Sequence, residues 1–319
     1  MKPIPLPPQK PDEPSGRKRI TGRGDSVVPM KGGWFMVIFG TVFVVVGAVI
    51  VLSQLGVFEI ANAKRNAPPF VIIAAGLMFF ITGLFIWLGA VVSFRQQSLI
   101  KQAQAAYPDE PAMKDHPWDP AGATYSRWAP VVKSALFVIL LGFLMVPFNW
   151  WAFFSGEGPV PVMLITLFFD LILLFLLWAF IRAVIQAVRY VPGRVTWARF
   201  PIRVGGPVEL FWSAPSEAWS GGHFTLRCGE EFTEVTRRGS KTSQSTVHEE
   251  IWSQRIDAGA GMGGAFGEPI RLEYQPPADL PGTDFSGERR KYWELELELE
   301  TPGVNRTERF LIPVYREKA

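Results

Sequence analysis

The sequence is poor in charge, cysteine and histidine. Only 19% of its 319 residues are charged, Cys228 is the single cysteine, and the three histidines, His116, His223 and His248, are scattered. One cysteine excludes an intrachain disulfide, and scattered histidines exclude the usual spacing of a structural zinc site. A net charge of +3 gives no field that would attract nucleic acid. The chain therefore predicts no metal, no cofactor and no nucleic-acid partner.

Hydrophobic residues are abundant instead, at 48% of the chain, with 25 Phe and 12 Trp. Four apolar runs, 34–55, 70–94, 131–154 and 160–185, are each long enough to cross about 30 Å of hydrocarbon. The first run is too long for the apolar region of a signal peptide and is expected to be retained. The sequence thus predicts a bundle of four transmembrane helices over 34–190, embedded in the lipid bilayer.

Lysine and arginine are concentrated in alternate connections between these runs. The segment before the first run, the loop 95–130 and the residues after the fourth run are basic, whereas 155–159 contains no basic residue. Because basic loops remain in the cytoplasm, both termini are expected there, in a multi-pass protein of the cell inner membrane. Glycines recur every seven residues at Gly40 and Gly47 and at Gly76 and Gly83, which predicts that the first two helices pack as an antiparallel pair.

Residues 1–33 form a basic, proline-rich segment without apolar periodicity, and we expect it to be disordered. Its stretch PIPLPPQKP is compatible with a polyproline II ligand. The simpler interpretation is a positively charged tail that fixes the topology and contacts anionic lipid.

Residues 191–319 are typical of an all-β cytoplasmic domain. Short strand-like segments separated by turn residues are expected at 194–200, 207–212, 223–228, 231–235, 247–252, 269–274, 292–300 and 308–315. About eight such strands favour a β-sandwich of the immunoglobulin type. The polar segment 236–246 and the glycine-rich 259–267 are expected to be loops, because the GxGxxG spacing in the latter is followed by a strand and not by the helix that a dinucleotide site needs.

The segment WELELELE alternates strictly between apolar residues and glutamates. Trp293 and the three leucines are expected to face the core, and Glu294, Glu296, Glu298 and Glu300 to face water, with a hairpin turn at 301–305. A binding role for the glutamate row is the less favoured alternative. The same alternation places Cys228 in the core as a structural residue and sends His223 to the opposite face, which argues against a catalytic thiol.

Asp170 is an acid inside the fourth apolar run, about 15 Å from its start. Thr82 lies at a similar depth in the second run, and Thr166 lies one turn from Asp170 on the same helix. Since no basic residue lies at this level, we expect Asp170 to be protonated or linked to water, donating to a carbonyl or a hydroxyl. A hydrogen bond that fixes helix packing is favoured over a proton or cation relay, although acids within membranes often mark function.

The stretch YPDEPAMKDHPWDPAGATYSRW (107–128) resembles a cytoplasmic-loop motif of bacterial multi-pass inner-membrane proteins of uncharacterised function, and Ala112 stands where that motif has tryptophan. The C-terminal PPADLPGT…YWELELELETPGVN…FLIPVY is similar to the end of their last domain and to the arrestin-like sandwich. The resemblance implies an architecture and no activity. Its loop positions are Pro108, Asp109, Glu110, Pro111, Trp118 and Gly122. Trp118 is expected to dock on the sandwich or the membrane, with partner binding as the sharper alternative.

Together these features predict a membrane protein that is not an enzyme, because no nucleophile–base pair, phosphate loop or metal cluster is present in the sequence. Its cytoplasmic sandwich would act as a scaffold that binds a protein or peptide partner. A transport or proton-coupled subunit centred on Asp170 is the competing hypothesis. Association between copies of the chain is left open.

Overall fold

The computed structural model describes residues 18–20, 23, 26–27, 33–57, 68–108, 110–156, 158–214, 219–238, 241–259 and 268–316. The chain forms two compact units. The first, which we call the β-domain, combines Met1–Pro29, Leu99–Ser126 and Tyr190–Ala319, and the second, the helical domain, combines Met30–Ser98 and Arg127–Arg189. Segments far apart in the sequence therefore join the C-terminal strands, so the expected divisions at 33/34 and 190/191 hold only in part.

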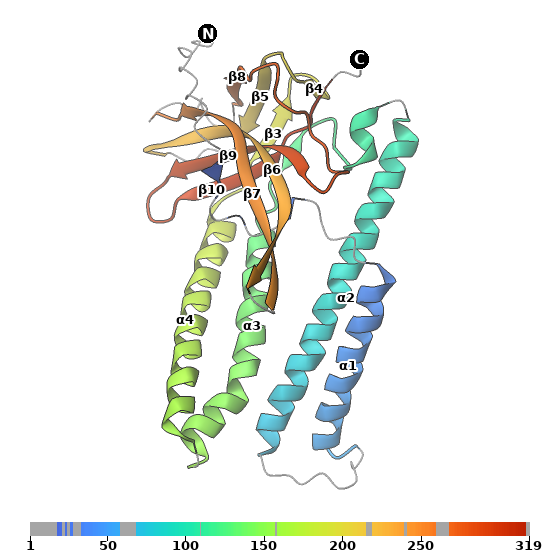
Figure 1. Cartoon of the computed structure of the whole chain (residues 1–319). Helices are drawn as coiled ribbons and strands as arrows, with labels where there is room; N and C mark the ends of the chain where they lie inside the picture. The colour runs from blue at the N-terminus through green and yellow to red at the C-terminus, as the bar shows by residue number, and fades with distance from the viewer. Residues whose placement is uncertain are drawn as a thin grey trace. The chain divides into compact units, whose positions relative to one another are not determined.

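Four helices in the described part of the chain are long and apolar enough to cross a membrane (Figure 1). They are α1 (Trp34–Gln54), α2 (Pro69–Ala106), α3 (Ala129–Asn149), which continues as a π-helical turn over Trp150–Phe154, and α4 (Val160–Arg189). The main departure from expectation is α2, which continues twelve residues beyond the predicted end at 94. This extension, RQQSLIKQAQAA, is polar but consists mainly of good helix formers, so the helix outlasts its apolar run.

The predicted pairing of the first two helices is confirmed. A Cβ atom on Gly47 would collide with the backbone nitrogen of Phe80 and lie 2.6 Å from the carbonyl oxygen of Gly76, and a Cβ on Gly40 would lie 3.0 Å from the carbonyl oxygen of Gly83. The backbones of α1 and α2 therefore approach as closely as glycine allows, which is how helices gain van der Waals contact in lipid. Trp87 also reaches across and donates from Nε1 to the carbonyl oxygen of Val37 at 3.0 Å.

The described residues of the β-domain form three sheets, whose strands are antiparallel except for one parallel pair. Strands β1 (Lys18–Arg19), β7 (Lys241–Asp257), β6 (Gly221–Arg238), β9 (Arg290–Glu300) and β10 (Arg306–Leu311) form the first in that order. The second has the order β2 (Ala123–Thr124), β3 (Arg194–Trp197), β5 (Val208–Ser213) and β8 (Ile270–Tyr274). The third pairs β11 (Val314–Tyr315) with β4 (Ile202–Arg203) in parallel.

One hydrophobic core lies between the two larger sheets, as a sandwich requires. Trp212 and Leu210 enter it from β5, Leu226 from β6, and Trp293 and Leu297 from β9, and all are almost completely buried. Cys228 belongs to the same core, and burial raises the pKa of its thiol to about 12. A thiol held in its protonated form inside a core is structural, which agrees with the interpretation from alternation.

Several expected strand boundaries were wrong. The segments 223–228 and 231–235 form one strand, β6, which is 18 residues long and has a bulge in its pairing between Cys228 and Gly229. The described residues of the expected polar loop 236–246 instead belong to strands β6 and β7, paired from Thr233↔Thr246 to Arg238↔Lys241, and the threonines among them suit a pleated strand. The last expected strand is divided by Pro313 into β10 and β11, since proline cannot donate to a ladder. Of the glycine-rich 259–267, only Gly259 lies within the described residues.

The glutamate row of β9 is not uniformly solvated. Glu298 and Glu300 are exposed, as expected, but Glu296 is half-buried and Glu294 is only 1% exposed. Alternation along a strand fixes which face a side chain occupies, but it does not reveal what covers that face. Here the cover includes part of the N-terminal segment.

The expectation of a disordered tail over 1–33 was wrong for the described part of that segment. Lys18 pairs with Glu250 and Arg19 with Glu249, Val27 is buried, and Arg23 forms an ion pair with Glu294. Residues 1–17, which include PIPLPPQKP, lie outside the described residues. We call Lys18–Ile20, Arg23, Ser26 and Val27 the N-terminal strap. Its residues gain structure from the sheet that they cover, which composition alone does not show.

Candidate functional site

Asp170, the first candidate from the sequence, has a neutral partner. The side-chain amide of Asn149 in α3 donates to Asp170 Oδ1 at 3.0 Å, and the same Nδ2 lies 3.2 Å from the carbonyl oxygen of Met145. Asp170 therefore accepts a hydrogen bond from an amide, where we expected it to donate to a carbonyl or hydroxyl. Thr82 donates to the carbonyl oxygen of Met78 on its own helix, and Thr166 is buried. The structure gives neither threonine as a hydrogen-bond partner of Asp170.

The second candidate, the loop with the family-like motif, is packed into the β-domain. The short 3₁₀-helix Pro111–Lys114 buries Ala112 and Met113, and these join Trp118, Phe285 and Tyr292 in a second hydrophobic cluster. Pro108 is exposed, Glu110 is half-buried, and Asp109 lies outside the described residues. Gly122 has a φ of +132°, and a Cβ there would collide with the carbonyl oxygen of Val195. Most of the described residues of the motif therefore belong to a loop that packs against the β-domain.

Trp118 is held by a specific polar contact. Its Nε1 donates to the Tyr315 hydroxyl at 2.9 Å, and that hydroxyl donates to Asp115 Oδ1 at 2.8 Å. Burial raises the pKa of Asp115 above its ordinary value, against the lowering effect of the Tyr315 hydrogen bond. These two hydrogen bonds, from Trp118 to Tyr315 and from Tyr315 to Asp115, hold the loop against β11. Trp118 therefore docks on the β-domain.

His116 lies in the same cluster, 4.2 Å from Trp118 between ring centroids, and burial lowers its pKa from 6.5 to about 4. Between these two values the unfolded chain binds more protons than the folded one, so stability is lost as the pH falls through 6.5 towards 4. We expect the free energy of unfolding of the β-domain to fall by about 2 kcal/mol between pH 7 and pH 5 through this residue. Denaturant titrations of the full chain in detergent at both values would measure it. The variant His116→Phe should lose less, and an equal loss in both proteins would contradict the assignment.

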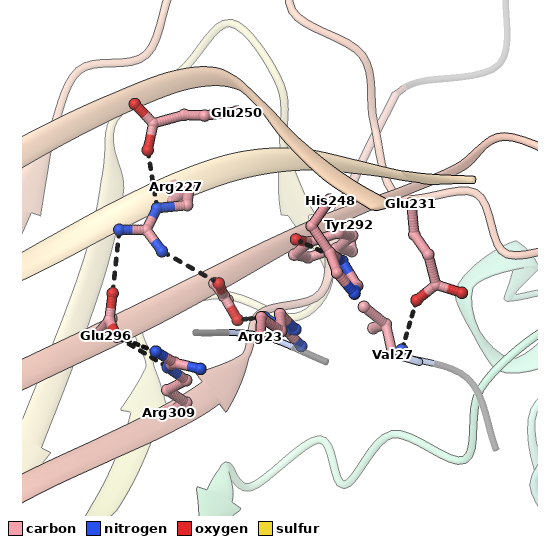
Figure 2. A network of polar contacts seen from close by, with 10 residues as sticks. Arg23, Val27, Arg227, Glu231, His248, Glu250, Tyr292, Glu296 and Arg309 are labelled. Atoms are coloured by element: carbon pink, nitrogen blue, oxygen red, sulfur yellow. Dashed lines mark hydrogen bonds and ion pairs between the residues drawn. The ribbon is translucent and has the colours of Figure 1, made fainter. Parts of the chain in front are cut away.

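A third site, which the sequence did not reveal, is the outer face of the five-stranded sheet (Figure 2). Arg227 of β6 contacts three carboxylates there: Glu250 at 2.9 Å, Glu294 at 3.5 Å and Glu296 at 2.9 Å. Arg309 of β10 contacts Glu296 at 2.6 Å. Burial alone would raise the pKa of Glu296, but the charges of Arg309 and Arg227 more than offset it and hold that pKa below the ordinary value. The charged side chains of this network therefore hold one another in position.

Arg23 of the strap completes this network. Its guanidinium forms an ion pair with Glu294 and lies 4.7 Å from the centre of the Tyr292 ring, in the position of a cation–π contact. Burial lowers the pKa of Arg23, while the nearby Tyr292 and Glu231 oppose that effect. Figure 2 shows Arg23 placed on the sheet beside Tyr292. The geometry is that of a built guanidinium site, with a carboxylate at its base and an aromatic face beside it.

The strap has a second anchor three residues later. Glu231 Oε2 accepts from the backbone N–H of Val27 at 2.5 Å, and Glu231 Oε1 accepts from Ser26 Oγ at 2.6 Å. Arg290 contacts the same Oε1 at 2.7 Å, and Tyr292 is linked to His248 Nδ1 at 3.2 Å. Glu231 therefore accepts a backbone donor and a hydroxyl donor from the strap.

The outer face brings together acceptors for two kinds of donor. Among the described residues no group of three or more His, Cys, Asp or Glu is placed to hold a metal ion. What the outer face offers is a buried carboxylate for a guanidinium and a second carboxylate for a backbone N–H. Sequence reasoning missed Arg23, and the only hint was the apolar pair Val27 and Val28 inside an otherwise polar segment.

No protein-family model matches the chain, and the comparison with curated proteins gave no match. Among solved structures, the sporulation control protein Spo0M of Bacillus subtilis aligns with 39% of this chain at 14% identity and a TM-score of 0.24. The alkylpurine DNA glycosylase AlkC of Pseudomonas fluorescens, bound to DNA with an abasic-site analogue, aligns with 86% of this chain and 77% of its own, at 12% identity and a TM-score of 0.14. The chain matches about half (49%) of the Spo0M chain, and scores this low support neither a fold nor a function.

Proposed function

We propose that this protein is a membrane-anchored scaffold, not an enzyme, whose cytoplasmic β-domain binds an extended segment of another protein. The four apolar helices support the membrane anchor, and the basic segments next to them support a cytoplasmic position of both termini. We also infer that the sandwich is of the arrestin-like kind and that the chain belongs with the inner-membrane proteins that its loop and C-terminal motifs resemble.

The observation that carries the proposal is the long edge strand β7. It has 17 residues, and within the described part of the chain its outer side pairs only with the two residues of β1, followed by the hydrogen bond from Ile20 N to the carbonyl oxygen of His248 at 2.9 Å. A sheet edge of this length is usually shortened, bulged or covered, because its free N–H and C=O groups bind other chains. Within the described ranges most of this edge has no strand paired to it, and it lies beside a built charge network.

An open edge of this kind binds an extended peptide by adding a strand to the sheet. Backbone hydrogen bonds supply much of the affinity, and side chains of the added strand enter sites on either face of the sheet. The chain's own β1 already occupies the edge in this way at Glu249 and Glu250. We therefore expect a protein partner to pair with β7.

A photoreactive amino acid at position 255 of β7 would test this in native membranes. Arg255 is exposed, and its Nε forms an ion pair with Asp257 Oδ1 at 2.7 Å. Both side chains of this pair are exposed, so replacing Arg255 should leave the fold intact. We expect a crosslink to one short segment of a partner, identified by mass spectrometry and abolished by a synthetic peptide of that segment.

The matched control is position 307 of β10, where Thr307 is exposed on the opposite edge strand of the same sheet. It should give no such crosslink. Equal crosslinks from positions 255 and 307, or none from 255, would contradict binding at the β7 edge.

The competing hypothesis of a transport subunit rests on Asp170. The hydrogen bond from Asn149 supports a helix-packing role for this acid, since it links α3 and α4 without a second charge. We therefore retain the scaffold as the proposal.

A further inference from the structure

The following inference rests on the proposed function and names the ligand of its site. We propose that the outer face of the five-stranded sheet is an arginine-binding site, that Arg23 of the N-terminal strap fills it as an intrachain ligand, and that an arginine-bearing extended peptide of the partner displaces the strap. The elements of the site are Glu294 and Tyr292 of β9 and Glu231 of β6, in the same sheet as the edge strand β7.

The charges of the sheet itself leave one carboxylate in excess. Apart from the strap, the connected network contains three carboxylates, Glu250, Glu294 and Glu296, and two guanidinium groups, Arg227 and Arg309. With the strap in place Glu294 is only 1% exposed, and its contact with Arg227 is the longest that this arginine makes, at 3.5 Å. A segment that covered Glu294 without bringing a cation would leave a buried carboxylate with a weak partner, which is costly. Arg23 brings that cation, and any arginine placed there would do the same.

The site also discriminates between cations. The ring of Tyr292 lies 4.7 Å from the Arg23 guanidinium carbon. A planar guanidinium can stack on an aromatic face while it donates to a carboxylate, whereas a lysine ammonium is compact and more strongly hydrated. The ligand chemistry that fits is arginine.

In the described part of the chain the strap is held by few groups, which makes it replaceable. Its strand has two residues, and the ion pair of Arg19 with Glu234 is exposed on both sides, so it adds little. Its main anchors are Arg23 and Val27. A partner that supplied an equivalent arginine and also paired along the rest of β7 would form more backbone hydrogen bonds than the strap does.

The register of the strap specifies the ligand further. The strap runs antiparallel to β7, with Lys18 opposite Glu250 and Arg23 five residues later at Glu294. Ser26 and Val27 then present donors to Glu231. A competing peptide should run in the same direction, with its arginine five residues beyond the residue that faces Glu250 and a small apolar residue four positions after the arginine.

A fluorescent synthetic peptide of residues 16–29, GRKRITGRGDSVVP, is the probe for this site. The receptor is the full chain in lipid nanodiscs, and fluorescence polarisation measures binding. The variant Arg23→Ala, whose own strap has lost one of its two main anchors, should bind the peptide at least tenfold more tightly than the unmodified chain does. On this receptor a peptide with Arg23→Lys should bind at least fivefold more weakly, and the additional substitution Glu294→Gln in the chain should remove the preference for arginine.

A disulfide lock provides a second test that does not depend on the stability of the Arg23→Ala variant. Arg19 and Glu249 are opposite one another in the antiparallel pair of β1 and β7. The next pair, Ile20 and His248, is hydrogen-bonded through Ile20 N and His248 O. Because the two kinds of pair alternate, Arg19 and Glu249 form a non-hydrogen-bonded pair, in which the Cα atoms are closer together. The double variant Arg19→Cys/Glu249→Cys can therefore be bridged. The reduced form should bind the peptide at least tenfold more tightly than the oxidised form of the same protein.

The outcomes are separable from those of the edge-strand experiment. The inference is overturned if the Arg23→Ala chain melts normally but binds the peptide no better than the unmodified chain, if arginine and lysine peptides bind alike, or if oxidation of the lock has no effect. If the Arg23→Ala chain fails to fold, the lock decides. A partner crosslinked at position 255 together with any of these failures would leave the scaffold function standing and remove only the arginine site.

Discussion

Glu308→Gln should destabilise the β-domain by about 3–5 kcal/mol, because it leaves a buried cation without its partner. Arg306 and Glu308 are only 3% and 2% exposed. Arg306 Nη2 contacts Glu308 Oε1 at 2.7 Å, and its remaining contacts include the carbonyl oxygen of Val191, at 2.7 Å, and the faces of Tyr190 and Trp212. None of these replaces a negative charge. Denaturant unfolding of the full chain in detergent, followed by tryptophan fluorescence, would measure the loss.

The Glu308 carboxylate also accepts two hydrogen bonds from other residues, which increases the expected loss of stability. Glu308 Oε1 accepts from the backbone N–H of Gly193 at 3.0 Å, and Oε2 accepts from Trp212 Nε1 at 3.4 Å. A Cβ atom on Gly193 would collide with Glu308 Oε2, so this glycine is required for the approach. The buried pair therefore also fixes the residues that follow α4.

The matched control is Glu209→Gln, which breaks the pair with Arg271 on the outside of β5. That pair has a similar separation, 3.0 Å, but the side chains are 31% and 42% exposed. Exposed ion pairs contribute at most about 1 kcal/mol, so this variant should be nearly unchanged. Comparable losses in the two variants would show that burial does not determine the strength of the Arg306–Glu308 contact.

Gly47→Ile should disrupt the α1–α2 pair and destabilise the helical domain by about 2–4 kcal/mol. The new Cβ would collide with the backbone nitrogen of Phe80 and lie 2.7 Å from its Cα, and backbone atoms cannot move aside as a flexible side chain can. The two helices would have to separate and lose contact along the whole face that the four glycines form. Unfolding by titration with SDS in mixed micelles would detect the change.

Gly142→Ile in α3 is the control for the same substitution in an apolar helix, because a Cβ there would meet no atom within 4 Å. It should leave the unfolding transition in place. An unchanged Gly47→Ile protein, or equal shifts in both variants, would show that close backbone approach does not stabilise this helix pair.

The sequence predicted those features that depend on local composition and periodicity. Length and hydropathy located all four apolar helices, and glycine spacing identified the face where α1 meets α2. Alternation in WELELELE placed Trp293 and the leucines in the core, and the turn before β10 was anticipated. These patterns are readable because each side chain's surroundings follow from its own helix or strand.

The candidate site depended on contacts between distant parts of the chain. The row of glutamates predicted a wet face, but the strap, more than 200 residues earlier, supplies the Arg23 that covers Glu294. Asp170 was recognised as an anomaly, yet its partner Asn149 could be found only when α3 and α4 were packed together. Hydropathy and period-two patterns report on one element at a time, so they cannot identify a partner on another.

The sequence by itself therefore determined the number and apolar character of the helices, the β-rich nature of the C-terminal part, and the core-facing side of its clearest strand. Only the tertiary structure decided which glutamates are buried, that the N-terminal strap and the Trp118 loop belong to the β-domain, and that the outer neighbour of β7 among the described strands is the short β1. The physical reason is that burial of a charge and completion of a sheet edge are set by long-range contacts, whereas periodicity is set by the geometry of a single helix or strand.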